Sequence, residues 1–184
     1  MLRQQHPLQP LWLWGLRAGC LLAAEAACQL DAPCNLLFWQ PAPTGKVVLQ
    51  QFLRLKVAGD MLDGSVKGAA NTLRAQLVAN ETVEIAGYRL SPALATGLER
   101  ATLAPPPLAS TSGSCRAVLL EISAREGANP SPVAATNAEA WRRAGYEVTT
   151  AFAVGPAFWQ TSEIEEVPAM IDATLAAVAE TADA

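Results

Sequence analysis

Arg17 is the side chain in this 184-residue sequence whose type and spacing point most directly to chemistry. It lies midway between Gly15 and Gly19, in a Gly-x-Arg-x-Gly segment. Because an arginine stays protonated at neutral pH, it cannot serve as a nucleophile. Its planar guanidinium can instead bind a carboxylate or a phosphate through two parallel hydrogen bonds. The segment therefore indicates a site for an anionic group, with the backbone N–H of Ala18 as a further donor.

A second interpretation gives Arg17 a structural role. Charged groups inside a protein must be paired, and Glu121 or Glu126 are the candidates for a buried partner. The sequence leaves both interpretations open, because a charged side chain in a protein interior can belong to a functional site or to a structural ion pair.

The residues around Arg17 predict the elements that would position it. Residues 11–14 are wholly apolar, which is typical of a strand buried on both faces. Residues 20–28 are rich in alanine and leucine and predict a helix. A sharp turn between the two brings their backbones close together, which Gly15 and Gly19 would allow. An anion beside Arg17 would then also lie at the partially positive N-terminus of the helix.

The rest of the chain predicts alternating strands and helices. Apolar runs indicate further strands at residues 35–39, 116–123 and 146–154. Ser131-Pro132 predicts the start of a helix that Gly145 closes. A last helix is predicted over residues 163–179, with one apolar stripe that runs through Ile164, Val167, Ile171, Leu175 and Val178. This order predicts an α/β fold, with a parallel sheet flanked by helices.

One segment interrupts the alternation. Residues 45–104 contain helical patterns near 45–62 and 69–78, an extended stretch at 82–90, and a helix that Ser91-Pro92 would cap. We therefore predict a helical, cap-like insertion at residues 45–104. Residues 1–44 would then form the first part of the α/β core, and residues 105–184 would form the remainder.

Four motifs give the chain a family resemblance. They are LWLWGLRAG at residues 11–19, NLLFWQP at 35–41, the segment from Gly45-Lys46 to Lys56, and GPAFWQTSEI at 155–164. Together they resemble the exosortase-associated hydrolases of the second type, which are bacterial members of the α/β-hydrolase superfamily. The resemblance runs over nearly the whole chain. It implies an α/β-hydrolase fold whose insertion is the cap over the substrate pocket, and an association with exosortase and exopolysaccharide systems.

The resemblance also implies a catalytic triad, and here the sequence departs from the family. Arg17 stands at the turn, or nucleophile elbow, where the family carries Ser, Cys or Asp. Glu126 is the candidate for the acid, and the loop at residues 155–161 should hold the histidine but has none. The single histidine, His6, precedes the elbow, which is contrary to the chain order Ser, Asp, His. Hydrolysis by a Ser-His-Asp triad is therefore not expected, and we predict a pseudo-hydrolase.

Other readings remain beside the pseudo-hydrolase. A working ester or thioester hydrolase would need another nucleophile, and Cys20 and Ser123 are the candidates. A complete α/β-hydrolase also has about four strands before its elbow, whereas this sequence has none there. We therefore expect the chain to correspond to the C-terminal portion of such a fold, with the upstream half in another chain or lost. A remnant without independent function is the third reading.

Aromatic residues supply the candidate ligand contacts. Trp39 ends one predicted strand, and Phe158 and Trp159 follow another, where they would line a pocket or fill the core. With Arg17 and Ala18, they predict a site for an anionic or saccharide-related small molecule. A protein of the exopolysaccharide machinery is the alternative partner.

Composition excludes several classes of function. The net charge of −4 and the absence of a basic stripe argue against nucleic-acid binding. The four cysteines form no C-x-x-C pair, so a zinc site is not expected, and nothing suggests another metal or a cofactor. No apolar run is long enough to cross a membrane, and Arg17 interrupts the segment that imitates a signal peptide. A cytoplasmic location is therefore expected.

Overall fold

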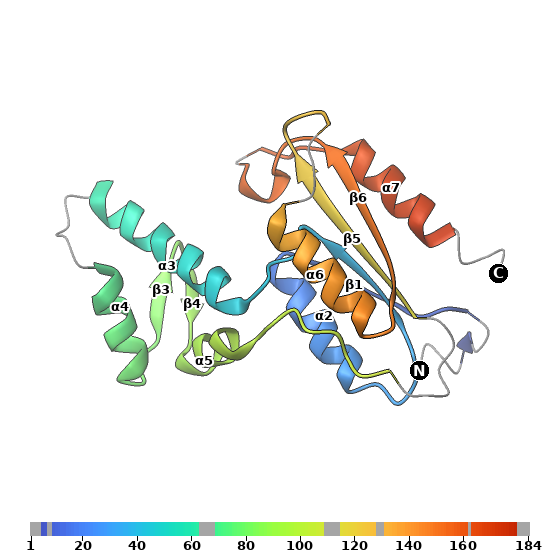
Figure 1. The fold of residues 1–184 in the computed structure, drawn as a ribbon. Helices are drawn as coiled ribbons and strands as arrows, with labels where there is room; N and C mark the ends of the chain where they lie inside the picture. Colours follow the sequence, from blue (N-terminus) through green and yellow to red (C-terminus); the bar gives the residue numbers. More distant parts are fainter. Residues whose placement is uncertain are drawn as a thin grey trace. The chain divides into compact units, whose positions relative to one another are not determined.

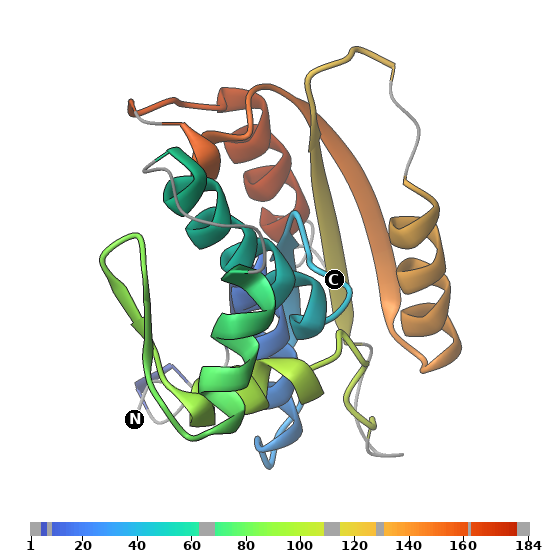
Figure 2. The ribbon, with the colours of Figure 1, turned by 90° about the vertical axis from the view of Figure 1, so that its left-hand side faces the viewer.

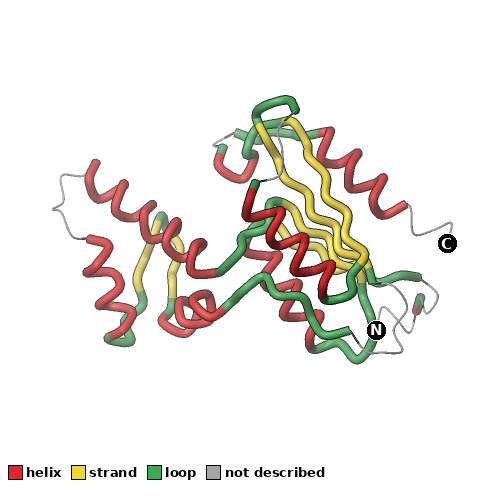
Figure 3. Tube along the Cα trace, in the orientation of Figure 1, coloured by secondary structure: helices red, strands yellow, loops and turns green. Residues whose placement is uncertain are grey.

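The computed structural model describes residues 5–6, 9–62, 69–108, 115–127, 131–161 and 163–179. The chain divides into two compact units. The first comprises Met1–Pro41 with Leu103–Ala184, and the second is the segment Ala42–Thr102. Each unit is built around its own core, and Figure 3 shows the helices and strands of both.

A four-stranded parallel sheet is the centre of the first unit, so the predicted α/β class is confirmed. Its strands are β1 (Trp12–Leu16), β2 (Asn35–Trp39), β5 (Arg116–Ser123) and β6 (Glu147–Val154), and they lie side by side in this order. Because all four run in the same direction, the chain segments that follow them emerge at one edge of the sheet (Figure 1).

Helices cover both faces of this sheet. Alternate residues of a strand point to opposite faces. On β2, Phe38 contacts Trp141 of α6 (Pro132–Arg143), whereas Leu37 packs in one cluster with Met170 of α7 (Pro168–Ala179). The helices α6 and α7 therefore lie on opposite faces, as Figure 2 shows for β5 and β6.

The helix α2 (Ala18–Cys28) follows β1 and shares a face with α6. Gly15 lies opposite Phe38 in the register of β1 and β2, so the two positions face the same way. A Cβ atom at Gly15 would meet the backbone of Cys20 in the first turn of α2. The strand β1 and the helix α2 therefore pack through the glycine.

The sequence prediction for β1 was wrong in one respect, since this strand is not buried on both faces. It occupies the edge of the sheet, and Trp14 at its centre is 60% exposed. The reason is that α7 packs against β5 and β6 and leaves the outer part of its face uncovered at β1.

The predicted last helix was also wrong in its start and in its buried face. The helix α7 begins at Pro168 rather than at residue 163, because proline fits the first turn of a helix. Ile164 lies before it and is 98% exposed, and Ile171 and Leu175 are exposed as well. Met170 and Ala177 are buried instead. Met170 and Ala177 pack in one cluster with Leu37, Val118 and Leu120 of the sheet, so contact with the sheet decides which face of α7 is buried.

Capping residues begin and end the helices as expected. The hydroxyl of Ser131 accepts a hydrogen bond from the backbone N–H of Ala134 at 3.1 Å, and Pro132 occupies the first turn of α6. The chain leaves this helix through Gly145, whose φ of 92° is in the region that favours glycine.

The second unit contains three helices among its described residues. These are α3 (Gly45–Leu62), α4 (Ala69–Val78) and α5 (Pro92–Arg100). A hairpin of β3 (Val83–Ile85) and β4 (Tyr88–Leu90) replaces the single extended stretch that the alternation suggested. Its turn at Ala86 and Gly87 has positive φ at both positions, as two-residue hairpin turns require. The buried core of this unit comprises Leu49, Leu53, Leu73, Val83, Ile85, Leu90 and Ala95.

Candidate functional site

Arg17 has an unusual backbone conformation at the junction of β1 and α2. Its φ of 54° and ψ of −115° lie outside the regions that side chains normally allow. Such a conformation costs on the order of 1–3 kcal/mol and persists only where the surrounding structure imposes it. The N–H of Arg17 donates to the carbonyl of Trp39 at 2.9 Å, which extends the pairing of β1 with β2 beyond the last strand residue. A sharp strand-to-helix turn therefore presents Arg17 at the edge of the sheet.

The two glycines that flank Arg17 have different roles. A Cβ atom at Gly15 would come within 2.5 Å of the backbone of Gly19 and Cys20, so only glycine fits. A Cβ atom at Gly19 would meet nothing within 4 Å. The expectation that close packing requires both glycines was therefore wrong for Gly19, because this residue already lies on the outer side of the helical turn.

The guanidinium of Arg17 lies over an aromatic ring. Its Cζ atom is 5.5 Å from the ring centroid of Trp159, which is within the range of a cation–π interaction. Arg17 and Trp159 are both half-buried. The arginine is thus held by contacts from the segment that follows β6.

Trp159 belongs to a series of four aromatic residues in edge-to-face contact, which we call the aromatic row. Ring centroids are separated by 4.7 Å between Trp14 and Trp39, by 6.0 Å between Trp39 and Phe158, and by 5.2 Å between Phe158 and Trp159. Such contacts add stabilisation beyond the burial of apolar area. The structure therefore brings Trp39, Phe158 and Trp159 together with Arg17 and adds Trp14 to them.

The segment after β6 is fixed by close packing and hydrogen bonds. A Cβ atom at Gly155 would come within 2.6 Å of Val167, so glycine permits this approach. The short helix η1 (Phe158–Gln160) follows, and the hydroxyl of Thr161 lies 2.9 Å from the Phe158 carbonyl. The indole N–H of Trp39 donates to Thr174 Oγ1 at 2.9 Å, which joins the aromatic row to α7. The indole N–H of Trp159 is buried and has no acceptor among the described residues.

The glutamates considered as buried partners of Arg17 are not buried. Glu126 is exposed in the loop after β5. Glu121 is half-buried, and its carboxylate accepts hydrogen bonds from the N–H and the hydroxyl of Ser131 at 3.2 and 3.0 Å. The carboxylate of Glu121 thus stabilises the start of α6. Neither Glu121 nor Glu126 is therefore the buried partner that the second interpretation of Arg17 required.

Cys20 is poorly suited to be a nucleophile. It is fully buried, and its thiol lies 3.2 Å from the carbonyl oxygen of Gly15, to which it donates. Burial raises the pKa of Cys20 to about 12, although the hydrogen bond to Trp39 and the charge of Arg17 act in the opposite direction. Since the thiolate is the reactive form, this group is inert near neutral pH. Ser123, the other candidate, accepts a hydrogen bond from the N–H of Arg125 at 3.1 Å.

The geometry brings together a cation, a helix N-terminus and an aromatic row. No side chain caps the start of α2, and its first turn has no acidic residue. The first N–H groups of a helix have no partner within the helix, so they can bind an anion. The only histidine of the chain, His6, is exposed and precedes β1, and residues 155–161 contain none. The arrangement therefore suits the binding of an anion.

Sequence reasoning missed two residues that shape this edge. Gln40 follows β2 with a φ of 44°, and its side-chain oxygen accepts a hydrogen bond from the N–H of Ile122 at 2.7 Å. Thr174 is the acceptor of the Trp39 indole. Gln40 could have been suspected from its position between a strand and Pro41, whereas nothing in the sequence pairs Thr174 with Trp39.

Comparisons with protein families, curated proteins and solved structures find no match to this chain. In the ranges that the structure describes, no three His, Cys, Asp or Glu side chains gather in a way that could hold a metal ion. None of the described helices combines the length and the apolar character that are needed to cross a bilayer.

Proposed function

We propose that this protein is a cytoplasmic α/β-hydrolase-like binding protein without hydrolytic activity. Its ligand would carry a carboxylate or phosphate that binds between the guanidinium of Arg17 and the first N–H groups of α2. The observation that carries this proposal is the strained turn at Arg17, with φ of 54° and ψ of −115° directly before an uncapped helix. Strain of this kind is commonly retained where it has a function.

Charge and shape support an anionic ligand. The guanidinium and the positive end of α2 both favour negative charge at the turn. Trp159 beside Arg17 offers a face for an apolar or sugar ring. Its indole N–H is buried without an acceptor among the described residues, which is uncommon for a buried polar group and supports a ligand there. An anionic or saccharide-related small molecule is therefore the favoured ligand class. The four motifs of the family resemblance extend the proposal to a role beside exosortase and exopolysaccharide systems.

A hydrolase with an alternative nucleophile is the less favoured proposal. The thiol of Cys20 is buried and protonated near neutral pH. Purified protein should therefore show no turnover of short-chain aryl esters above background. Stoichiometric labelling of the chain by a serine-directed phosphonate probe would favour the hydrolase instead.

The binding site is tested by titration calorimetry with inorganic phosphate and with a dicarboxylate such as succinate. Arg17→Lys keeps the charge but loses the planar fork, so it should weaken binding at least tenfold while the protein stays folded. The matched control is Arg142→Lys, which makes the same change at an exposed position of α6. Equal affinities of Arg17→Lys, Arg142→Lys and the parent protein would contradict the proposed site.

A further inference from the structure

Two buried cysteines, Cys34 and Cys115, line one cavity at the edge of the sheet opposite to Arg17. Cys34 directly precedes β2, and Cys115 directly precedes β5. Leu36 lies opposite Ala117 at the start of the paired stretch, and the side-chain oxygen of Asn35 accepts a hydrogen bond from the N–H of Arg116 at 3.0 Å, so Cys34 and Cys115 directly precede two residues in contact. Each cysteine lies two residues before Leu36 or Ala117, and residues two apart in an extended chain point to the same face of a sheet. Both side chains therefore belong to the face that α2 and α6 cover.

Tyr146 directly precedes β6, the neighbour of β5 in the sheet. Arg116 lies opposite Glu147 in the pairing of β5 with β6, and the N–H of Glu147 donates to the carbonyl of Cys115 at 2.9 Å. Tyr146 is therefore the neighbour of Cys115. Its ring packs against Trp141 of α6 at 4.8 Å, and its hydroxyl donates to the carbonyl of Pro106 at 3.2 Å. Both contacts hold the side chain of Tyr146 in place.

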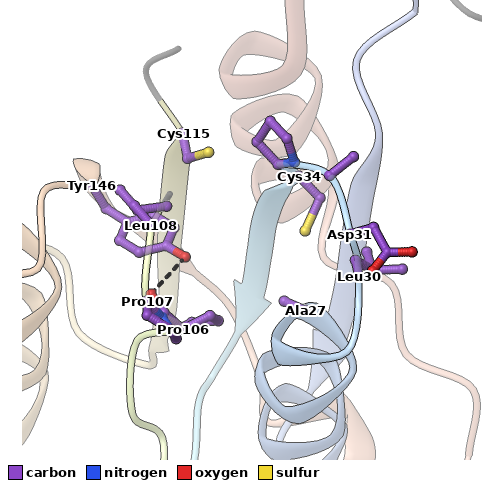
Figure 4. A pocket seen from close by; sticks show the side chains of 11 residues that line it. Ala27, Leu30, Asp31, Cys34, Pro106, Pro107, Leu108, Cys115 and Tyr146 are labelled. Atoms are coloured by element: carbon purple, nitrogen blue, oxygen red, sulfur yellow. Dashed lines mark hydrogen bonds between the residues drawn. The ribbon is translucent and has the colours of Figure 1, made fainter. Parts of the chain in front are cut away.

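A cavity of about 80 Å³ opens beside the starts of β2, β5 and β6. Its lining includes Cys34, Cys115 and Tyr146, together with Leu30, Asp31 and Pro106. In Figure 4 the sulfur of Cys115 points from β5 toward the side of Cys34. Cys34 is 8% exposed and Cys115 is 2% exposed, so Cys34 is the more accessible of the two. The cavity therefore borders both members of a pair that is otherwise covered.

The general spacing of neighbouring strands is compatible with a disulfide between residues that directly precede them. Neighbouring strands lie about 4.7–4.9 Å apart, and disulfides join Cα atoms about 4.4–6.8 Å apart. Both cysteines are thiols in this structure. Burial raises the pKa of Tyr146, and Cys115, Cys34 and Cys28 raise it further, because negative charges on these groups would repel one another. Tyr146 lines the same cavity as Cys34 and Cys115.

We propose that Cys34 and Cys115 are a redox-active pair that a low-molecular-weight disulfide, such as glutathione disulfide, converts to a disulfide. The thiolate of Cys34 attacks the reagent, forms a mixed disulfide and releases one small thiol. The thiolate of Cys115 then attacks the sulfur of Cys34, forms the Cys34–Cys115 bond and releases the second small thiol. The protein loses two electrons and two protons, and the reagent gains both.

The proposed bond would link the starts of β2 and β5. The chain between the two cysteines contains the whole second unit, Ala42–Thr102. Oxidation would therefore close that unit into a covalent loop and restrict the unfolded chain, which is how a disulfide stabilises a protein. Cys28 at the end of α2 is exposed and would compete for the reagent, so the test removes it.

The test uses the full chain with Cys28→Ser, incubated in the folded state with glutathione disulfide. Thiols are then counted in denaturant, and trypsin peptides are sequenced by mass spectrometry. Three thiols should fall to one, and the peptides that contain Cys34 and Cys115 should be linked. The linked protein should melt at a higher temperature than the reduced one, and dithiothreitol should reverse both changes.

Two further variants serve as controls on that background. Adding Cys34→Ser should leave the two remaining thiols unlinked. Adding Cys20→Ser should preserve the link, because Cys20 lies at the other end of β1 against Gly15. Three thiols that persist in the folded Cys28→Ser protein, or a link that involves Cys20, would overturn the proposal. The thiol count needs no variant at Cys34 or Cys115, so a failure of those variants to fold leaves the test decisive.

Discussion

Arg17 and Trp159 meet at one edge of the sheet, with 5.5 Å between the guanidinium carbon and the indole centroid. Arg17 follows the first strand of the sheet, and Trp159 follows the last one. Their contact therefore depends on the whole strand order, in which β2 and β5 separate β1 from β6. The contact unites a strained turn, a cation and the aromatic row in one place, and this combination is the basis of the proposed anion site.

The turn itself can be tested through its two glycines. Gly15→Ala would place a Cβ atom 2.5 Å from backbone atoms that cannot move away independently. We expect it to lower the free energy of unfolding by about 1–3 kcal/mol, as overpacking does. Gly19→Ala is the matched control, because space is open there and alanine favours a helix over glycine by about 0.5–1 kcal/mol. Urea unfolding of both variants checks this. Equal destabilisation of the two would contradict the described turn.

The strain at Arg17 predicts a conflict between stability and binding. Arg17→Gly should relieve the unfavourable φ of 54° and raise the free energy of unfolding by about 1 kcal/mol. The same change removes the guanidinium, so phosphate binding should be lost. Calorimetric titration and urea unfolding of one preparation measure both effects. A variant that is less stable than the parent would indicate that Arg17 serves the fold rather than a ligand.

Cys20 predicts a loss of stability at alkaline pH. Folding raises its pKa from 9.0 to about 12 because burial disfavours the thiolate. Between these two values the unfolded chain has released the proton and the folded chain has not, so stability falls as the pH rises. The stabilisation is fully present below pH 9. Relative to Cys20→Ala, the parent should lose about 1.4 kcal/mol per pH unit above this point.

Urea unfolding of the parent and of Cys20→Ala at pH 7.5, 9.5 and 10.5 measures the effect. Taking the difference between the two proteins cancels the titration of groups that they share. A difference that is constant over this range would mean that the thiol of Cys20 ionises as readily in the folded protein as in the unfolded chain. The nucleophile hypothesis for Cys20 would then regain support.

The outer edge of β1 predicts self-association. Trp14 is 60% exposed there, and edge strands with apolar side chains tend to pair with other chains. Sedimentation velocity should detect concentration-dependent association, and Trp14→Lys should reduce it, since lysine protects an edge. Leu22→Lys is the control, because Leu22 is 72% exposed on α2 rather than on the edge strand. A parent chain that is monomeric at all concentrations would refute this prediction.

Local sequence signals predicted the local structure well. A short apolar strand, Gly15 and an alanine-rich helix indicated the turn, and Ser131-Pro132 and Ser91-Pro92 indicated two helix starts that the structure contains. These features depend on residues within one or two turns of each other. Such short-range preferences act in the same way whatever the rest of the fold is.

Features that depend on distant residues were harder to predict. The face that α7 buries was missed because Met170 and Ala177 lie on one side of this helix and Ile171 and Leu175 lie on another, and only the sheet decides between them. The exposure of Trp14 follows from the edge position of β1, which a single strand pattern cannot reveal. Glu121 was one of two candidate partners of Arg17, whereas its carboxylate accepts a hydrogen bond from the hydroxyl of Ser131.

The central claim is that Arg17 and the start of α2 bind an anion. The most direct measurement is the melting temperature of the parent protein in increasing sodium phosphate, against sodium chloride at the same ionic strength. A ligand that binds only the folded state stabilises it as its concentration passes the dissociation constant. We predict a rise in melting temperature that is specific to phosphate and absent in Arg17→Lys. Identical melting curves of the parent protein in phosphate and chloride would contradict the claim.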